Sequence, residues 1–150
     1  MKAAIQKNAT LLALYAIVAT AIVGTISLLT APRIERQEQT QLLNTLASII
    51  EPSLHNNDLY QDCHFLNDPL FSAKQQTFYI AKQNEEPVAI AITTSAPDGY
   101  NGNIDIIVAV NMSGEVTGVR TLKHQETPGL GDKIELRKDN WILSFTGNKV

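Results

Sequence analysis

Several residue types that build common protein sites are scarce in this 150-residue chain. It has a single cysteine, Cys63, so no disulfide can form within one chain. Three histidines are scattered, and Cys63 is adjacent to His64, whereas zinc ligands are usually spaced by two or more residues. We therefore predict no metal site. Aromatic residues make up 6%, the net charge is -3, and no basic patch is interleaved with aromatics, which argues against nucleic-acid binding.

Charged residues are also missing from one long stretch near the N-terminus. Lys7 and Arg33 bracket residues 8–32, which contain no charged side chain. As a helix this stretch measures roughly 37 Å at about 1.5 Å per residue, more than a hydrocarbon core of about 30 Å. A cleavable signal peptide is the alternative, but its apolar region usually has about 7–15 residues and ends at a small-residue cleavage site. The longer run favours an uncleaved transmembrane anchor over residues 9–31.

The orientation of this anchor depends on the flanking basic residues. Lys2 and Lys7 lie on one side, and Arg33 and Arg36 lie on the other, so the count is nearly balanced. We predict a single-pass topology with the short head, residues 1–8, in the cytoplasm, as expected for an N-terminal anchor. The rest of the chain then lies outside the cytoplasm.

Residues 32–75 are interpreted as a helix and an irregular linker segment. Leucine and isoleucine recur at helical spacing in the first part, at Leu42, Leu43, Leu46, Ile49 and Ile50. This spacing predicts a helix over about 33–50, either separate from the membrane helix or continuous with it, that Pro52 ends. The apolar stripe is typical of a core-facing side, and a surface for a partner subunit is the alternative. Residues 51–75 show no period and are rich in loop-forming residues.

Residues 76–150 are interpreted as the main domain. Four runs rich in β-branched and aromatic residues, separated by turn residues, predict strands at 77–81, 88–94, 104–110 and 116–122. Their short connections favour an antiparallel meander, with a break over 96–102. The run 104–110 is apolar on both faces except for Asp105.

A helix is predicted to follow the strands. It begins at Asp132, which we expect to be its N-cap, and its apolar residues Ile134, Trp141 and Phe145 lie partly at helical spacing. The predicted fold class is therefore α+β. A single N-terminal transmembrane helix precedes an extracytoplasmic domain that has an antiparallel sheet and flanking helices.

The connection between the last strand and this helix, residues 123–133, has unusual backbone properties. Pro128 fixes its own φ and favours an extended conformation of the residue before it. Gly129 and Gly131 flank Leu130, so that the backbone can take a positive φ or approach a flat partner closely. These features fit an ordinary turn with a helix cap, and they also fit a loop that grips a planar cofactor.

Three motifs bear on that choice: Gly99-Tyr100-Asn101-Gly102-Asn103-Ile104, then Glu126-Thr127-Pro128-Gly129-Leu130-Gly131, and Trp141 with Phe145 and Gly147. Together they resemble the FMN-binding domain family of membrane electron-transport complexes, of the Rnf/Rsx and sodium-translocating NADH:quinone reductase types. The resemblance implies a membrane-anchored flavoprotein subunit of an ion-translocating complex that relays electrons through FMN. It also implies the bacterial inner membrane, a periplasmic main domain, other membrane subunits as partners, and a flavin transferase.

For the cofactor site, the resemblance implies six FMN-binding residues: Tyr100, Glu126, Thr127, Gly129, Leu130 and Gly131. An isoalloxazine ring needs an apolar contact, backbone donors and a defined orientation, because the redox chemistry belongs to the cofactor. Leu130 and its glycine neighbours offer the first two. Glu126 offers an acceptor for a ring N–H, or is simply a solvated charge. Tyr100 packs near the ring or the ribityl chain, or is a core aromatic at a strand edge. No catalytic residue is predicted.

In this family FMN is joined through its phosphate to a threonine within a Ser/Thr-Gly-Ala-Thr pattern after the tryptophan. Ser144-Phe145-Thr146-Gly147 does not match that pattern, so we expect the attachment threonine to lie outside residues 1–150. The domain over 76–150 is then incomplete at its C-terminal end, and the chain is truncated or a fragment. Two alternatives to the electron relay follow: a non-redox structural or assembly subunit, and a stand-alone anchored FMN oxidoreductase.

Overall fold

The computed structural model describes residues 2–66 and 75–149, which form two compact units, 1–41 and 42–150. The helix α1 (Lys2–Ala47) makes up the first unit, and its last residues belong to the second. In the described part of the chain α1 is the one helix long and apolar enough to cross a membrane. The hydroxyls of Thr25 and Thr30 donate to the carbonyls of Ala21 (2.7 Å) and Ile26 (2.9 Å), so these polar groups are satisfied inside the helix.

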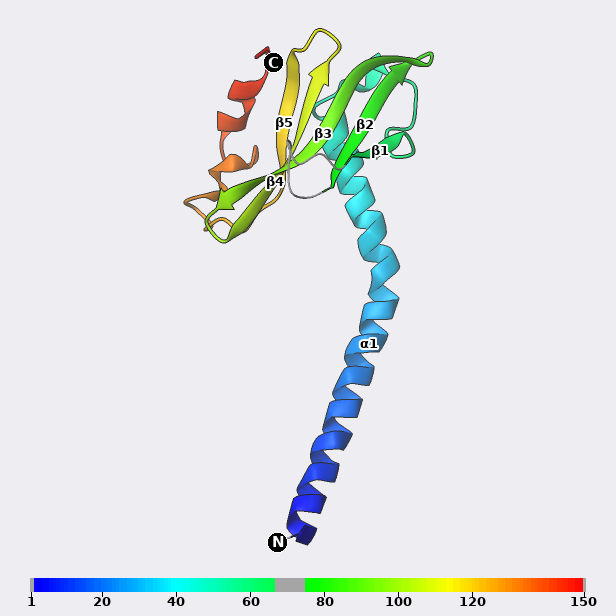
Figure 1. Ribbon diagram of the computed structural model, residues 1–150, viewed down its shortest axis with the longest axis vertical. Coiled ribbons are helices and arrows are strands. Elements are labelled where there is room, and N and C mark those ends of the chain that lie inside the picture. Colours follow the sequence, from blue (N-terminus) through cyan, green and yellow to red (C-terminus); the bar gives the residue numbers. More distant parts are fainter. Residues whose placement is uncertain (1, 67–74, 150) are drawn as a thin grey trace. The chain divides into compact units, whose positions relative to one another are not determined.

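The second unit contains a five-stranded antiparallel sheet whose spatial order follows the sequence, β1-β2-β3-β4-β5 (Figure 1). The strands are β1 (Cys63–Leu66), β2 (Gln76–Gln83), β3 (Glu86–Gly99), β4 (Gly102–Asn111) and β5 (Val116–Lys123). The predicted α+β class and the antiparallel meander are confirmed.

Two strands differ from the prediction. The strand β1 was not predicted, because its four residues are mostly exposed and pair only with β2, so they show no alternation of apolar and polar residues. The strand β3 extends into the expected break at 96–102 as far as Gly99, so the turn is confined to Tyr100 and Asn101. The ladder between β3 and β4 shifts register between Ala96 and Gly99, and Pro97, which has no N–H to donate, lies at that irregularity.

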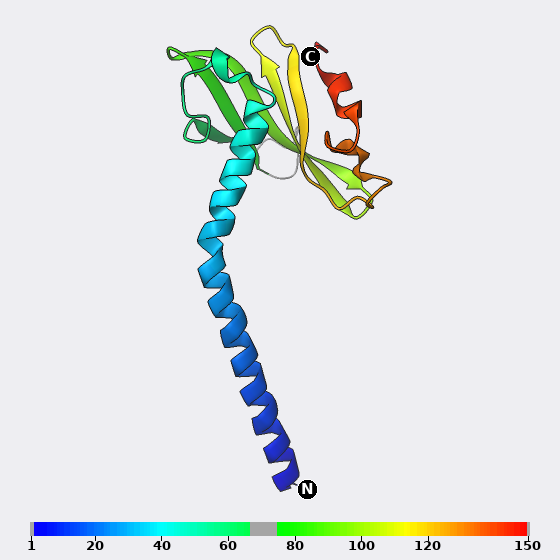
Figure 2. The ribbon, with the colours of Figure 1, turned by 180° about the vertical axis from the view of Figure 1, so that it is seen from behind.

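One face of the sheet is covered by the end of α1 and the turn that follows it (Figure 2). Leu46, Ile49 and Ile50 are buried there, which confirms the core-facing interpretation for these three, whereas Leu43 is 37% exposed. The buried residues that the sheet contributes to this cluster are mostly small: Ala81, Ala89, Ala91 and Ala109, together with Ile107 and Tyr79. Small side chains allow the helix end to lie close to the strands.

The closest approach is at Gly118 on β5. A Cβ atom added there would lie 2.8 Å from Cγ2 of Ile49, a separation that real Cβ atoms essentially never show. Side chains of the same strand bind carbonyls of the turn that follows α1: the Thr117 hydroxyl donates to Ile49 O (2.7 Å), and Arg120 Nη2 donates to Ser48 O (3.1 Å). The strand β5 therefore holds this turn in place.

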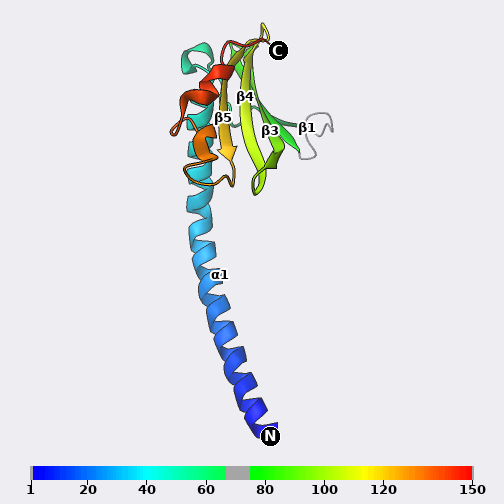
Figure 3. The ribbon, with the colours of Figure 1, turned by 90° about the vertical axis from the view of Figure 1, so that its left-hand side faces the viewer.

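The opposite face of the sheet is covered by the segment after β5, which runs alongside that strand (Figure 3). Period-two alternation places Val108 and Val110 on this face, while Ile107 and Ala109 face the helix end. Ile142 is buried against Val116 and Val119. The cover is partial, because a cavity of about 360 Å³ remains between the segment and β3, β4 and β5.

The helix predictions need two corrections. The helix expected over 33–50 is continuous with the membrane helix, as one of the two alternatives held, because both are parts of α1. Its end is corrected: α1 ends at Ala47, and Pro52 instead opens the 3-10 helix η1 (Pro52–Leu54). The helix expected from Asp132 is two 3-10 helices, η2 (Asp132–Ile134) and η3 (Asn140–Phe145). The second begins anew because the Asp139 side chain accepts the N–H of Trp141 (2.8 Å).

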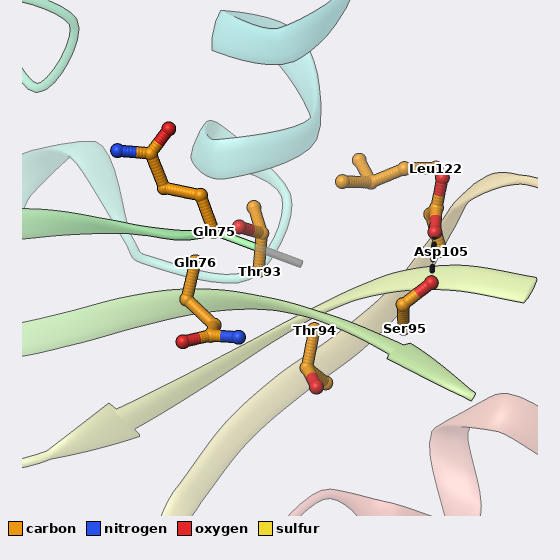
Figure 4. A pocket seen from close by; sticks show the side chains of 7 residues that line it. All are labelled: Gln75, Gln76, Thr93, Thr94, Ser95, Asp105 and Leu122. Carbon is orange, nitrogen blue, oxygen red and sulfur yellow. Dashed lines mark hydrogen bonds between the residues drawn. The ribbon is translucent and has the colours of Figure 1, made fainter. Parts of the chain in front are cut away.

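A smaller pocket of about 190 Å³ has a partly polar wall that includes Gln76, Thr94 and Asp105 (Figure 4). The Ser95 hydroxyl and the Asp105 carboxylate point toward each other from β3 and β4 and are hydrogen-bonded. Gln76 is almost fully buried. The bond between Ser95 and Asp105 satisfies the single charged side chain of β4 inside an otherwise apolar strand, which explains how Asp105 is tolerated there.

The contact between Gly118 and Ile49 gives the first prediction. We expect Gly118→Ala to destabilise the second unit by about 1–3 kcal/mol, because the added methyl group overpacks against Ile49. Urea unfolding of the full chain in detergent, followed by the fluorescence of its one tryptophan, measures this. Lys123→Ala, at the exposed end of the same strand, is the control and should change stability by no more than about 0.5 kcal/mol. Equal effects of the two variants would contradict the docking of the helix end on β5.

Candidate functional site

The Thr-Pro-Gly-Leu-Gly segment forms a tight turn. The Thr127 carbonyl accepts the N–H groups of Leu130 (3.1 Å) and Gly131 (3.0 Å). Pro128 stands at the second position of the turn and Gly129, with φ 77°, at the third, which is the residue pattern of a type II turn. The turn leaves the Leu130 side chain 76% exposed, and there is open space beside Gly129.

Glu126 ties this turn to the end of the β3–β4 hairpin. Its Oε1 accepts the N–H of Tyr100 at 2.8 Å, across 26 positions of sequence. The carboxylate lies between two glycines: a Cβ on Gly131 would be 2.5 Å from Oε2, and one on Gly99 would be 3.0 Å from Oε1. Three separate parts of the family motifs, Gly99-Tyr100, Glu126 and Gly131, therefore meet around one carboxylate. One oxygen of the Glu126 carboxylate, which was expected to be a free acceptor, thus joins the turn to the hairpin end. We call this contact between Glu126 Oε1 and Tyr100 N the latch.

His124 holds the backbone of Glu126 from the other side. Its Nδ1 accepts the N–H of Glu126 (3.1 Å), so in this arrangement the proton of the neutral ring is on Nε2. That nitrogen donates to Glu135 Oε1 at 2.9 Å. Arg137 also binds Glu135, and its hydrogen bond, with a smaller contribution from His124, lowers the pKa of that carboxyl group.

Asp132 stabilises the turn in a way the sequence did not indicate. Gly131, not Asp132, occupies the N-cap position of η2, and the predicted capping role is wrong. Asp132 Oδ1 instead accepts the N–H of Gly129 (2.9 Å), and Oδ2 pairs with Lys138 Nζ (3.2 Å). The hydrogen bond from Gly129 is the largest cause that lowers the pKa of this buried carboxyl group, and Lys138 adds to it.

A groove of about 530 Å³ opens beside the turn. Its apolar wall comes from Ile104 of β4, Leu130 of the turn, Ile134 of η2 and Trp141 of η3. Trp141 is 53% exposed and its ring packs edge-on against Phe145, with centroids 5.1 Å apart at 89°. The groove adjoins the cavity under η3, because Ile104, Ile134 and Trp141 line both.

Three of the six predicted site residues, Glu126, Leu130 and Gly131, line this groove. The other three, Tyr100, Thr127 and Gly129, are not among the described residues that line it. Tyr100 is 82% exposed and takes part through its backbone N–H, so it is not a core aromatic. Thr127 and Gly129 shape the turn through their backbone.

The predicted set lacked five groove residues: Ile104, Lys133, Ile134, Asp139 and Trp141. Two of them, Ile104 and Trp141, stood in the motifs that carried the resemblance, which was a usable signal. No such signal pointed to the two charged residues, Lys133 and Asp139. Their position follows from the two short 3-10 helices and not from any local pattern.

Comparison with known families agrees with this geometry. The model of the FMN-binding domain matches residues 99–149, which include the hairpin end, the turn and the groove. The model of the RnfG N-terminal region matches residues 1–49, from the start of the chain to the turn that docks on β5. The fold and the groove thus define an FMN-binding domain in a chain with an apolar N-terminal helix.

Similar proteins define the family more narrowly. The G subunit of the ion-translocating oxidoreductase complex from Shewanella loihica is 49% identical over 152 residues, covering 100% of this chain and 72% of that protein. The protein of the same name from Vibrio cholerae is 50% identical over 151 residues, with the same two coverages. The chain belongs to the G-subunit family of ion-translocating oxidoreductase complexes.

The groove fits the FMN that its family implies. A flavin ring has flat apolar faces and an edge rich in hydrogen-bond acceptors. The groove offers exposed Leu130 and Trp141 side chains for such a face, and Lys133 as a donor on its wall. Its volume lies within the range of about 300–1,000 Å³ that is typical of ligand sites.

The latch gives the second prediction. We expect Gly131→Ala to displace the Glu126 carboxylate, break its bond to Tyr100 N and destabilise the second unit by about 1–3 kcal/mol. Denaturant unfolding followed through Trp141 fluorescence measures the change. In a Glu126→Gly background, which removes both Oε2 and the Cβ that would lie 2.9 Å away, the same substitution should cost less. Additive effects of the two substitutions would contradict the latch.

Proposed function

We propose that this chain is a membrane-anchored flavoprotein subunit of an ion-translocating electron-transport complex and relays electrons through FMN. The observation that carries the proposal is the groove beside the Thr-Pro-Gly-Leu-Gly turn. Leu130 and Trp141 line this groove with exposed side chains, and hydrogen bonds fix the backbone around them. Membership of the G-subunit family supports it. When bound, FMN supplies the redox chemistry, and the chain's own residues bind and orient it.

The residues of the groove and of the turn beside it have proposed roles. Leu130 and Trp141 contact the apolar faces of the ring. Gly129 and Gly131 shape the turn that presents Leu130, because their own N–H groups bind Asp132 and the Thr127 carbonyl. Thr127 shapes that turn through its carbonyl, and its hydroxyl is available to the cofactor. Glu126 acts mainly through the latch that joins Tyr100 to the turn. A backbone braced in this way costs little further entropy when it binds a ligand.

The partners follow from the family. The chain is a subunit of a multi-subunit complex, and we propose that its neighbours are the complex's other membrane subunits. We propose a separate flavin transferase as the enzyme that attaches FMN, to a threonine outside residues 1–150. Domain limits of 1–8, 9–31, 32–75 and 76–150 remain our proposal for the head, the anchor, the linker and the flavin domain.

Flavin loading tests the proposed function. The native protein isolated from its own membrane, where its complex and the transferase are present, should contain flavin, detected as yellow absorbance and as fluorescence on a gel. We expect Leu130→Asp to lose most of that flavin, because a carboxylate replaces an apolar ring contact. Leu143→Asp is the matched control, since Leu143 is also exposed and is not among the described groove residues. A colourless native protein that still co-purified with membrane partners would refute the relay and support an assembly subunit.

The topology is a second testable part. We propose the inner membrane, with the N-terminus in the cytoplasm and the sheet domain in the periplasm. A C-terminal alkaline phosphatase fusion should be active, and a C-terminal fusion to a fluorescent protein that matures only in the cytoplasm should be dark. The reverse pair of results would refute this orientation.

A further inference from the structure

The groove contains an unusual set of charges for an otherwise apolar site. Its described lining includes two carboxylates, Glu126 and Asp139, and one ammonium group, Lys133. Lys133 lies in η2, the 3-10 helix that starts directly after the turn, and its side chain is exposed. A cation on the wall of a flavin groove affects the cofactor directly, because charge near the ring tunes its redox properties.

Both carboxylates of the groove already accept backbone hydrogen bonds. Glu126 Oε1 accepts the N–H of Tyr100 at 2.8 Å, and Asp139 Oδ1 accepts the N–H of Trp141 at 2.8 Å. Each of these bonds holds its acidic side chain to a structural position. The acidic groups of the groove therefore have defined structural roles.

The neighbouring cations of the same segment are also engaged. Lys138 pairs with Asp132 at 3.2 Å, and Arg137 binds Glu135. Within residues 2–66 and 75–149, Lys133 is the basic residue of the segment 124–139 for which no ion pair or hydrogen bond is found. Its charge is thus available to a ligand in the groove.

We propose that Lys133 contacts the acceptor-rich edge of the flavin and stabilises its reduced, negatively charged form. This inference rests on the proposed function. Two-electron reduction of FMN with uptake of one proton leaves a negative charge on the pyrimidine edge of the ring, whereas uptake of a second proton neutralises it. A nearby ammonium group favours the anion and hence the reduced state, and the two carboxylates oppose it.

The test is a potentiometric titration of the flavin in the purified complex, with native chain and variants compared across a range of pH. Lys133→Met keeps the length of the side chain and removes its charge. We expect the equilibrium constant for reduction to fall about tenfold, or about 30 mV for two electrons. Lys133→Arg keeps the charge and should retain most of the native value. Lys123→Met removes a charge at the exposed end of β5 and is the control.

The pH dependence gives a second readout that a structural role would not move. The native potential should change with one proton per two electrons over most of the range, and with two protons only at low pH. Without the Lys133 cation the anion is less favoured, so the change from two protons to one should move to higher pH by about one unit. Asp139→Asn retains an acceptor for Trp141 N and should shift both readouts the opposite way.

Other outcomes would overturn the inference. Loss of flavin from Lys133→Met with an unchanged potential in the remainder would mean that the ammonium group binds the phosphate. An equal shift in Lys123→Met would mean a long-range effect of net charge. Native complex that carries no flavin would refute the proposed function itself, and this is seen before any variant is compared.

Discussion

Residues 106–110 of β4 are apolar on both faces of the sheet, and this constraint organises the whole second unit. An antiparallel sheet can leave one face to water, but an interior strand with Ile107 and Ala109 on one side and Val108 and Val110 on the other requires two covers. The end of α1 supplies the first cover. The segment after β5 supplies the second, with Ile142 as the one buried residue of η3 and with space left over. The groove lies where the segment after β5 leaves part of this face uncovered.

The two segments that cover the sheet differ in structure, since one is regular helix and the other is irregular backbone. The first is a regular helix end docked over alanines and a glycine, and Thr117 and Arg120 bind carbonyls of the turn that follows it. The second consists of a tight turn and two 3-10 helices braced by side-chain bonds to backbone groups, such as Asp132 to Gly129 and Asp139 to Trp141. The N–H groups of Gly129, Leu130 and Gly131 are all bonded within the turn, so the backbone is held without a ligand while the Leu130 side chain stays exposed beside the groove.

Glu126 connects the two ends of the candidate site at a single point. Its carboxylate binds the hairpin end at Tyr100, lies against Gly99 and Gly131, and has its own backbone held by His124. The two glycines beside this side chain therefore have a steric reason. Only Gly129 of the turn takes a positive φ, whereas Gly131 is needed because of the space that Glu126 occupies.

Local patterns in the sequence determined the elements that local physics controls. The apolar run before Arg33 predicted a helix long enough to span a membrane, and runs rich in β-branched and aromatic residues between turn residues predicted β2 to β5. The motifs around Gly99, Glu126 and Trp141 identified the cofactor class by resemblance. The tertiary structure decided that Glu126 is a latch, that Asp132 holds the turn and that Ile104, Lys133 and Trp141 share one groove. These contacts join residues far apart in the chain, so they depend on strand register and on close packing, which no local periodicity encodes.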